Sequence, residues 1–569
     1  MRNEEIARLF YLIADLLEIQ NVQFKPIAYR RAAQSIEGLS EGIELIYEKG
    51  GLKSLEEIPA IGVNVALKIE EYLKTGKMKH LEELKKQVPI DESLLHIGGL
   101  GPKRIKLLYN ELGIKTVDDL EKAAKAGKIK NIRTLGAGVE ENILEAIQFF
   151  KSHSRRFILG YIQKDIDLLV ERLKKSNFTE RVEVCGSARR KKETIGDLDI
   201  LAISKNSSKL IDFFTKLNDV QKVLGKGLKK STVLLQNGLQ VDLRVLDKKY
   251  FGAAMQYFIG SKEHNVSLRK LAISKKYKLS EYGLFKGKKV IAGENEKDIY
   301  NSLGLDFIPY EIRENSGEIE AALKHKLPKL VELKDIQGDC HMHTLQTDGT
   351  CTMEQMIEAA IKLGRKYIVF TDHTKALGIT NGLDEKALLQ QIKKIEKMNK
   401  KYSEITILSG AELNILDDGN PDIDNKVLKQ LDVVVGSVHT GFKQDKEKIT
   451  RRTMKAMENE NIDIIGHPTG RKIQVREPFA IDLNKVMEKA KETETALEIN
   501  SYPQRLDLKD VHIREAVNRN VKLVISTDSH HTSHLEFMKF GVDQARRGWA
   551  EKKNILNTLP LDKFLKNLK

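Results

Sequence analysis

Two aspartates that lie two residues apart are the first candidates for chemistry in this chain. Asp197 and Asp199 stand in the run Asp-Leu-Asp-Ile-Leu-Ala-Ile. Because side chains alternate along a β-strand, a strand here would point both carboxylates to the same side. A third carboxylate, Asp242, shares one face of a second expected strand with Arg244. Three such acids can hold two divalent ions about 3.5–4 Å apart, an arrangement that serves nucleotidyl transfer.

Small and basic residues before these acids fit a polyphosphate. Gly186 and Ser187 offer a tight turn with exposed backbone N–H groups and a hydroxyl, and Arg189 and Arg190 follow directly. Gly196 precedes the first acid of the pair. An isolated Asp-x-Asp more often only decorates the end of a strand. Its combination with Gly-Ser, the arginines and a second acidic strand favours a nucleotide site with its metal ions.

A second set of candidate ligands fills the C-terminal part of the chain. From residue 336 on, short apolar runs end in potential metal ligands and are mostly separated by helical patterns. Strands that alternate with helices predict parallel βα units, and seven of them suggest a distorted TIM-like barrel with its chemistry at the C-terminal rim. The ligands in these runs are His341, His343, His373, Glu412, His439, His467, Asp528 and His530. Six histidines with carboxylates exceed what one zinc ion needs, so we expect a multinuclear hydrolytic site.

The composition limits the class of protein and its partners. A chain of 569 residues is too long for one hydrophobic core, so we expect several domains. Its net charge of +15 favours a polyanionic partner, above all nucleic acid. No apolar run reaches the roughly 18 residues of a membrane span, and we expect no membrane partner. The three cysteines lack a zinc-ligand spacing and fit a reducing cytoplasm.

Glycine-containing turns in the N-terminal part indicate contacts with a DNA backbone. Residues 1–85 show an amphipathic helical pattern, and a glycine turn leads into a helix at three places, the third of them degenerate. In such helix-hairpin-helix units, glycine lets backbone N–H groups at a helix start meet a phosphate. An isolated copy is often only a helical turn, whereas three in sequence favour DNA binding. The candidate contacts are Gly62, Gly99, Gly101, Lys103 and Arg104.

With these motifs, residues 1 to about 315 resemble DNA polymerases of the X family, the group that contains DNA polymerase beta. The resemblance implies that Asp197 and Asp199 bind two ions, Mg²⁺ or Mn²⁺, and that Asp242 shares this metal site and positions the primer 3′-hydroxyl. Arg244 would contact DNA. The residues that would meet the triphosphate of the incoming dNTP are Gly186, Ser187, Arg190 and Gly196.

The run Gln-Tyr-Phe-Ile-Gly-Ser-Lys-Glu-His-Asn and the arginine after it resemble the nucleotide-selecting pocket of the same family. There an aromatic pair excludes an extra sugar hydroxyl, the asparagine meets the base edge and the arginine meets the template-side minor groove. The implied residues are Tyr257, Phe258, Gly260, Asn265 and Arg269. Lys262 and His264 depart from the vertebrate pattern, so the selectivity of the pocket stays open.

The N-terminal helices resemble the lyase domain of that family. Lys68 falls where lyase-competent relatives carry their Schiff-base lysine, and Lys25 and Tyr29 match residues that contact a 5′-phosphate. A lysine that is buried or crowded by cations can lose its proton and attack an abasic sugar. Asn64 and His80 replace two lysines of the phosphate pocket, and a lysine on a helix surface is usually only a solvated charge. Lyase activity is therefore a secondary hypothesis.

Nearly all of residues 336–569 resemble the polymerase and histidinol phosphatase (PHP) domain. The resemblance adds Asp348 to the ligands above, which makes nine, and implies a phosphoesterase site with three ions of Mn²⁺ or Zn²⁺. In X-family polymerases with this domain, the implied reaction is 3′-to-5′ exonucleolysis, sometimes with 3′-end phosphatase or abasic-site cleavage. Arg505 is a weaker candidate for contact with phosphate.

These expectations combine into a multidomain α+β and α/β protein. The predicted layout is a helical lyase-type domain at 1–85, a helix-hairpin-helix subdomain at 86–150, a nucleotidyltransferase palm at 151–246, a nucleotide-selecting subdomain at 247–315, a linker at 316–335 and a PHP barrel at 336–569.

The sequence thus predicts a prokaryotic, nucleoid-associated repair polymerase that fills gaps and carries a metal-dependent 3′-to-5′ exonuclease. We expect a monomer whose partners are gapped or primed double-stranded DNA and dNTPs. A nuclease whose polymerase half is only a DNA clamp is the main alternative, and the retained aspartates argue against it. A non-enzymatic scaffold that binds DNA ends and a small-molecule phosphatase of the histidinol type are further alternatives.

Overall fold

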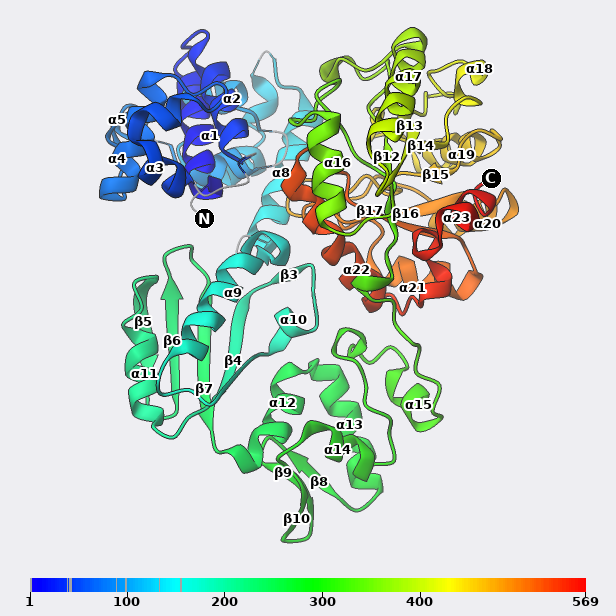
Figure 1. Ribbon diagram of the computed structural model, residues 1–569. Coiled ribbons are helices and arrows are strands. Elements are labelled where there is room, and N and C mark those ends of the chain that lie inside the picture. The colour runs from blue at the N-terminus through cyan, green and yellow to red at the C-terminus, as the bar shows by residue number, and fades with distance from the viewer. Residues whose placement is uncertain are drawn as a thin grey trace.

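The computed structural model describes residues 3–37, 39, 43–88, 90–97, 100–132, 134–153 and 156–569. Figure 1 shows helices at the N-terminus, then a domain with a five-stranded sheet, a smaller domain with a three-stranded sheet, and a large domain around a seven-stranded sheet. We call them the helical domain (residues 3–153), the sheet domain (157–246), the small domain (248–323) and the barrel domain (338–569).

One hydrophobic core extends through the helical domain, from Ile6 to Ile147. The two helical units expected at 1–85 and 86–150 therefore share their core. Helices α4 and α6 begin directly after Gly62 and Gly101, whose backbones are extended. The helices are α1 (Asn3–Ile19), α2 (Lys25–Glu37), α3 (Ile43–Glu56), α4 (Val63–Thr75), α5 (Lys79–Gln87), α6 (Pro102–Leu112), α7 (Val117–Lys125) and α8 (Ala137–His153).

The sheet domain brings the two acidic strands together. Its strand order is β2-β4-β7-β6-β5, and β4 runs parallel to β7 with Asp199 paired to Asp242. Apolar residues of β7 are buried and alternate with half-buried polar ones, as the two-residue period predicts. The strands are β2 (Arg181–Val184), β4 (Asp197–Ile203), β5 (Val220–Lys226), β6 (Lys230–Leu235) and β7 (Gln240–Leu246); α9 (Leu159–Lys175) and α11 (Ser207–Thr215) contribute to the same core.

The small domain follows β7 directly. Its three strands are antiparallel in the order β10-β9-β8 and pack with its helices around a separate core. The elements are α12 (Phe251–Ile259), α13 (Lys262–Ser274), β8 (Lys278–Ser280), β9 (Gly283–Lys286), β10 (Lys289–Ala292), α14 (Glu296–Ser302) and α15 (Glu318–Leu323).

The barrel domain holds seven parallel strands in the order of the chain. A parallel bridge between Met342 and Ser529 joins the first strand's end to the last, so the sheet nearly closes. The predicted distorted TIM-like barrel, with helical N-terminal domains and a central sheet domain, is confirmed. The strands are β11 (Gly338–Asp339), β12 (Tyr367–Phe370), β13 (Thr406–Asn414), β14 (Val433–Ser437), β15 (Ile464–Ile465), β16 (Ala496–Asn500) and β17 (Leu523–Ser526).

Helices alternate with these strands, and almost all strand residues are buried because the sheet is covered on both faces. The helices are α16 (Met353–Lys362), α17 (Glu385–Lys401), α18 (Asn425–Leu428), α19 (Lys446–Met457), α20 (Leu483–Glu492), α21 (Asp510–Arg519), α22 (Met538–Arg547) and α23 (Leu561–Lys566).

The barrel domain packs against the sheet and small domains. Arg471 pairs with Glu193 of the sheet domain at 2.7 Å, and Trp549 is buried in the core of the small domain. Among the described residues, no helix is long and apolar enough to cross a membrane.

Candidate metal and nucleotide sites

Glu412, near the C-terminal end of β13, lies at the centre of the histidine ligands. Its side chain is 1 % exposed, and its two carboxylate oxygens face imidazole nitrogens on all sides. The nitrogens within 2.9–3.6 Å of these oxygens belong to His341, His343, His373, His439 and His467. A single carboxylate that faces five imidazoles is better suited to help hold metal ions than to accept five hydrogen bonds.

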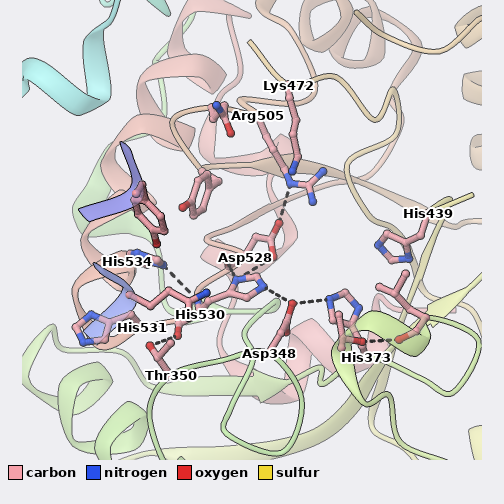
Figure 2. A pocket seen from close by; sticks show the side chains of 16 residues that line it. Asp348, Thr350, His373, His439, Lys472, Arg505, Asp528, His530, His531 and His534 are labelled. Atoms are coloured by element: carbon pink, nitrogen blue, oxygen red, sulfur yellow. Dashed lines mark hydrogen bonds and ion pairs between the residues drawn. The ribbon is translucent and has the colours of Figure 1, made fainter. Parts of the chain in front are cut away.

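Two further carboxylates complete the set. Asp528 Oδ1 lies 3.3 Å from His343 Nε2. Asp348 Oδ2 lies 3.3 Å from His530 Nε2 and 3.4 Å from His373 Nε2 (Figure 2). Three groups have ligand atoms that all lie within 4.8 Å of one another: His343, Asp348, His373 and His530; His341, His343 and Asp528; His373, Glu412 and His439. These groups contain eight of the nine predicted barrel ligands, and His343 and His373 belong to two groups each. The ninth ligand, His467, lies in the same cluster, with its Nε2 2.9 Å from Glu412 Oε1.

Buried nitrogens without a hydrogen-bond partner show that this cluster fits metal ions. Among the described residues they include His341 Nε2, His343 Nδ1 and Nε2, His373 Nδ1, His439 Nε2 and His467 Nδ1. Leaving a buried polar atom unpaired costs about 1–3 kcal/mol, so several in one place need a ligand to offset the cost. Neutral imidazole and carboxylate are the donors that Zn²⁺ and Mn²⁺ accept.

A second layer of polar groups orients these ligands. Glu498 on β16 lies 2.7 Å from His341 Nδ1 and accepts a hydrogen bond from the backbone N–H of His467. Asn414 holds His439 Nδ1 at 2.8 Å, and Asn500 donates to Asp528. Such partners fix the ring that faces a metal and raise its basicity. The sequence analysis did not identify Glu498, although it occupies the position two residues before the strand end at Asn500.

The pKa values show how strongly the cluster is coupled. Burial, together with His530 and His373, lowers the pKa of His343 to about 3. Burial also opposes the charge on His373, but Glu412 and Asp348 override it and raise the pKa of that imidazole to about 10. The metal-free cluster thus contains both a neutral and a protonated histidine at neutral pH.

Backbone geometry at two ligands departs from the usual regions. His467 and Asp528 have positive φ values of 29° and 53°. Such conformations are costly for residues other than glycine and concentrate at functional sites. Beside them, a side chain at Gly349 would meet the backbone of His343 at 2.7 Å, which requires glycine there.

A cavity of about 480 Å³ opens over the ligands and adds cations to them. Lys472 and Arg505 line it side by side in Figure 2, and Arg505 Nε pairs with Asp528 Oδ2 at 3.0 Å. Burial and the neighbouring Arg505 lower the pKa of Lys472, which makes no ion pair among the described residues. Two adjacent cations next to metal ligands suit a phosphate group. Lys472 was missed by the sequence analysis because no motif marks its loop.

The same cavity is also lined from another domain. Tyr11 on α1 and Gln34 on α2 belong to its wall, so the helical domain borders the barrel site. The sequence analysis did not anticipate this contact, since nothing in the sequence places the two domains side by side.

The sheet domain holds the predicted acids at one end of adjacent strands. Asp199 and Asp242 are paired residues of β4 and β7, and Asp197 lies two residues before Asp199 with its side chain more exposed. Asp242 accepts a hydrogen bond from Thr232 and lies 3.6 Å from Lys230 Nζ. Within the described residues, the groups whose ligand atoms all lie within 4.8 Å are those of the barrel, and these three acids are not among them.

The three acids nevertheless lie close enough to influence one another electrostatically. Burial, Asp197 and Asp242 raise the pKa of Asp199 to about 6. The negative charges of the three carboxylates repel one another, and a bound divalent cation would offset this repulsion. Gly186, with φ of 61°, lies directly over Asp199: a Cβ there would meet its carboxylate at 2.8 Å. The glycine of Gly-Ser therefore has a steric reason to be present.

Arg190 is held by groups other than a ligand. Its guanidinium donates to the carbonyl of Ile259 and to Glu314 Oε1 at 3.0 Å, and Arg547 of the barrel domain binds the same Glu314 oxygen at 3.1 Å. The carboxylate of Glu314 would therefore compete with a triphosphate for the guanidinium of Arg190. Ser187 and Gly196 lie half-buried near the acids, between β2 and β4.

The predicted nucleotide pocket lies on α12 and α13. The rings of Tyr257 and Phe258 pack edge to face with centroids 5.0 Å apart, and Arg244 stacks over Phe258 at 4.6 Å. Asn265 is 8 % exposed, donates to the Tyr257 carbonyl and accepts from Gln256. Two predicted residues remain. Gly260 lies beside Arg190, and a Cβ added to Gly260 would come within 3.2 Å of Arg190 Nη1. Arg269 donates a hydrogen bond to the Asn265 carbonyl.

Of the predicted DNA contacts in the helical domain, Gly62 and Gly101 are exposed and precede helix N-termini, and Lys103 and Arg104 are exposed on the first turn of α6. Gly99 lies outside the described residues.

The predicted lyase residues form one group. Lys68 Nζ lies 5.9 Å from the centre of the Tyr29 ring, and that ring stacks with His80 at 6.2 Å. Burial, opposed by Glu71 and aided by Lys25, lowers the pKa of Lys68. A lowered pKa is what a nucleophilic lysine needs.

Comparisons with known proteins cover most of the chain. Family models match a helix-hairpin-helix domain at residues 1–78, the DNA polymerase beta palm at 162–273, the DNA polymerase beta thumb at 254–314 and the PHP domain at 339–502.

Related proteins match either the whole chain or one of its parts. The DNA polymerase/3'-5' exonuclease PolX of Bacillus subtilis (strain 168) is 36% identical over 100% of both chains. DNA polymerase lambda of Rattus norvegicus is 24% identical over 54% of this chain and 55% of its own. A probable phosphatase of Thermoanaerobacter sp. (strain X514) is 30% identical over 34% of this chain and 78% of its own. Because the PolX relative matches along its whole length and that of this chain, the match shows to which family the chain belongs.

Proposed function

This chain belongs to the X-family DNA polymerases that carry a C-terminal PHP domain, and on that premise we propose that it extends DNA 3′ ends in the sheet domain and shortens them in the barrel domain. The observation that carries the proposal is the presence of two separate sets of candidate metal ligands in one chain: the acids of β4 and β7, and the nine candidate ligands of the barrel. The PolX relative is named for both activities.

In the sheet domain, we assign Asp197, Asp199 and Asp242 to binding Mg²⁺ or Mn²⁺ beside the primer 3′-hydroxyl and the dNTP. Their repulsion, visible in the raised pKa of Asp199, favours cation binding. Tyr257 and Phe258 would lie against the sugar, and Arg190 would exchange Glu314 for the triphosphate. The partners of Arg190 are one carboxylate, that of Glu314, and one carbonyl, that of Ile259. A polyphosphate carries more negative charge and more acceptor oxygens than these groups, so it can compete with them for the guanidinium.

In the barrel domain, the nine ligands would hold Mn²⁺ or Zn²⁺ next to the scissile phosphate. When bound, such ions supply positive charge to the phosphate oxygens and acidify an attacking water. Lys472 and Arg505 would hold the remaining phosphate charge, and Arg505 in turn orients Asp528. Glu498 and Asn414 keep the histidine rings in place through their second nitrogens.

The test is a duplex with a single-nucleotide gap and a labelled primer, incubated with Mg²⁺ or Mn²⁺ with and without dNTPs. Wild-type protein should lengthen the primer with dNTPs and shorten it without them. Asp197→Ala should abolish lengthening only, and His343→Ala should abolish shortening only. Lengthening that persists in Asp197→Ala would contradict the assignment of the sheet site. Loss of both activities in either variant would show that the two sites are not separable.

Two other readings make different predictions. A nuclease with a purely DNA-clamping sheet domain would shorten but never lengthen the primer, and the coupled acid triad argues against it. A phosphatase for small molecules such as histidinol phosphate would be inhibited by that compound and not by DNA. The cavity next to two cations accommodates either phosphate, so competition between the two substrates decides.

A second activity, cleavage at abasic sites, is favoured by the lowered pKa of Lys68. Its neighbours Lys25 and Tyr29 would hold the 5′-phosphate. The test is borohydride trapping on DNA with a 5′-deoxyribose phosphate. An adduct should form with wild-type protein and disappear in Lys68→Ala, whereas Lys74→Ala on the same helix serves as the control. An undiminished adduct in Lys68→Ala would reject the assignment.

The finer assignments complete the proposal. We propose a role in gap-filling repair, primed or gapped DNA and dNTPs as partners, a cytoplasmic and nucleoid-associated location, and a monomer. The net charge of +15 and the exposed Lys103 and Arg104 at a helix start support the DNA partner.

A further inference from the structure

Aromatic side chains border the barrel cavity beside the metal ligands, and the chemistry proposed above does not use them. Tyr502, His531 and His534 line the cavity together with Asp528 and His530. Figure 2 shows His531 and His534 on one side of these ligands and Lys472 with Arg505 on another. The cavity therefore has a cationic side and an aromatic side.

The aromatic side is held rigidly. The ring of His534 stacks on Phe537 with centroids 4.9 Å apart and an angle of 16°, and Tyr502 meets both rings edge-on at 5.4 Å. His534 Nδ1 accepts a hydrogen bond from the backbone N–H of His530 at 3.3 Å, so its ring is tied to a metal-ligand residue. Rings fixed in this way lose little entropy when a flat ligand packs on them.

The size and the two sides of the cavity indicate more than a phosphate group. A volume of about 480 Å³ lies in the range of sites for small organic ligands. A phosphate alone would satisfy the metal ligands, Lys472 and Arg505, and would leave the aromatic side of the cavity unoccupied. A nucleobase attached to that phosphate through its sugar would fill the remaining space and stack on a ring.

We propose that Tyr502 and His534 form a stacking surface for the nucleobase of the 3′-terminal nucleotide, while Lys472 and Arg505 hold its phosphate. The inference rests on the proposed exonuclease function and assigns its substrate contacts. Because every base offers a flat face, the surface accepts all four bases. Recognition by stacking distinguishes a nucleic-acid substrate from a phosphate ester without a base.

The experiment compares two single-stranded oligonucleotides with the full-length protein in Mn²⁺. One ends in an ordinary 3′ thymidine and the other in a tetrahydrofuran nucleotide that lacks the base. Wild-type protein should remove the thymidine nucleotide with a kcat/KM roughly tenfold higher, mainly through a lower KM, which is the order expected for stacking of one base. His534→Leu keeps an apolar group against Phe537 and should reduce this ratio to about one. His534→Phe keeps a ring and should preserve it.

A histidine on another surface provides the control. His325 is an exposed residue that pairs with Asp306, and His325→Leu should retain the wild-type ratio. If His534→Leu and His534→Phe show the same ratio as wild-type protein, the stacking surface is wrong. If both lose activity equally on the two oligonucleotides, His534 supports the metal ligands instead and the proposal is also overturned.

A binding measurement separates this inference from the exonuclease itself. Isothermal titration of the Mn²⁺-loaded protein should give a roughly tenfold higher affinity for thymidine 5′-monophosphate than for deoxyribose 5-phosphate, and His534→Leu should remove the difference. If wild-type protein degrades neither oligonucleotide, the proposed exonuclease fails. The titration then still decides base recognition, since equal affinities for the two ligands would refute it.

Discussion

The barrel site and the sheet site both collect acidic side chains at the ends of parallel strands. They differ in how many candidate ligand atoms lie close together and in how deeply these atoms are buried. In the barrel, Glu412 and His341 are buried, five imidazole nitrogens lie within 2.9–3.6 Å of the Glu412 carboxylate, and a second layer of residues fixes the rings. In the sheet domain, Asp197 is exposed and the three acids form no cluster as tight as those of the barrel.

The difference follows from the ligands that each site must admit. Under the proposed function, the sheet site would accept a new dNTP and a moving primer end in every cycle, so part of its metal coordination would come from the substrate. The barrel site offers enough protein donors that it would hold metal ions without substrate. The proposed function therefore contrasts a barrel centre that would be assembled by the protein alone with a sheet centre that the substrate would complete, and the predictions below test that contrast.

Removal of the central carboxylate should have the largest effect. Glu412→Gln should lower exonuclease activity by at least ~100-fold, because five imidazoles lose their common anionic partner. Primer extension should stay at the wild-type level. Glu404→Gln, an exposed change just before the same strand, is the matched control. A gel assay of primer shortening and lengthening measures both, and a comparable loss of extension would break the contrast between the two sites.

A chelator should remove metal from the two sites at different rates. Brief treatment with EDTA followed by dilution into Mg²⁺ should restore extension at once, because Asp197 is exposed and the other two acids are only half-buried, so an ion can enter and leave readily. Metal in the barrel should leave more slowly, since its ligands are buried and held by second-layer hydrogen bonds. Metal content by mass spectrometry at successive times gives the two rates. Equal rates of loss would show that the barrel site is no more closed than the sheet site.

Metal binding to the barrel should release protons. Glu412 and Asp348 raise the pKa of His373 to about 10, so this imidazole is protonated in metal-free protein at pH 8 and must lose its proton to bind a metal. Titration of metal-free protein with Zn²⁺ in weak buffer should therefore acidify the solution. His373→Gln should release fewer protons, whereas His343, whose pKa is about 3, has none to give. An unchanged proton count in His373→Gln would contradict the assigned charge state.

The smallest effect concerns stability of the metal-free sheet domain. Burial and its neighbours raise the pKa of Asp199 to about 6, so its contribution to stability is complete below about pH 4 and is lost as the pH rises through 6. In EDTA at pH 7.5, Asp199→Asn should therefore increase the free energy of unfolding by roughly 1–3 kcal/mol. Asp167→Asn, at an exposed position on α9, should not. Thermal unfolding at pH 5 and 7.5 measures the difference, and destabilisation at pH 7.5 would contradict the pKa.

The sequence by itself determined the features that follow from local periodicity. Alternation along a strand placed Asp197 and Asp199 on one side, and the apolar runs that end in histidine or acid predicted the barrel ligands. Parallel strands bring their ends to one rim, so the convergence of Glu412 with distant histidines was predictable without coordinates.

Only the tertiary structure decided which other groups share these sites. Lys472, Tyr502 and His534 come from loops or a short 3₁₀ turn, where no period relates position to direction. Arg190, expected at a triphosphate, is held instead by Glu314, because packing of the barrel and small domains brings Arg547 and Glu314 to it. Contacts between loops and between domains depend on how complete surfaces pack, and that information is not contained in the local spacing of residues.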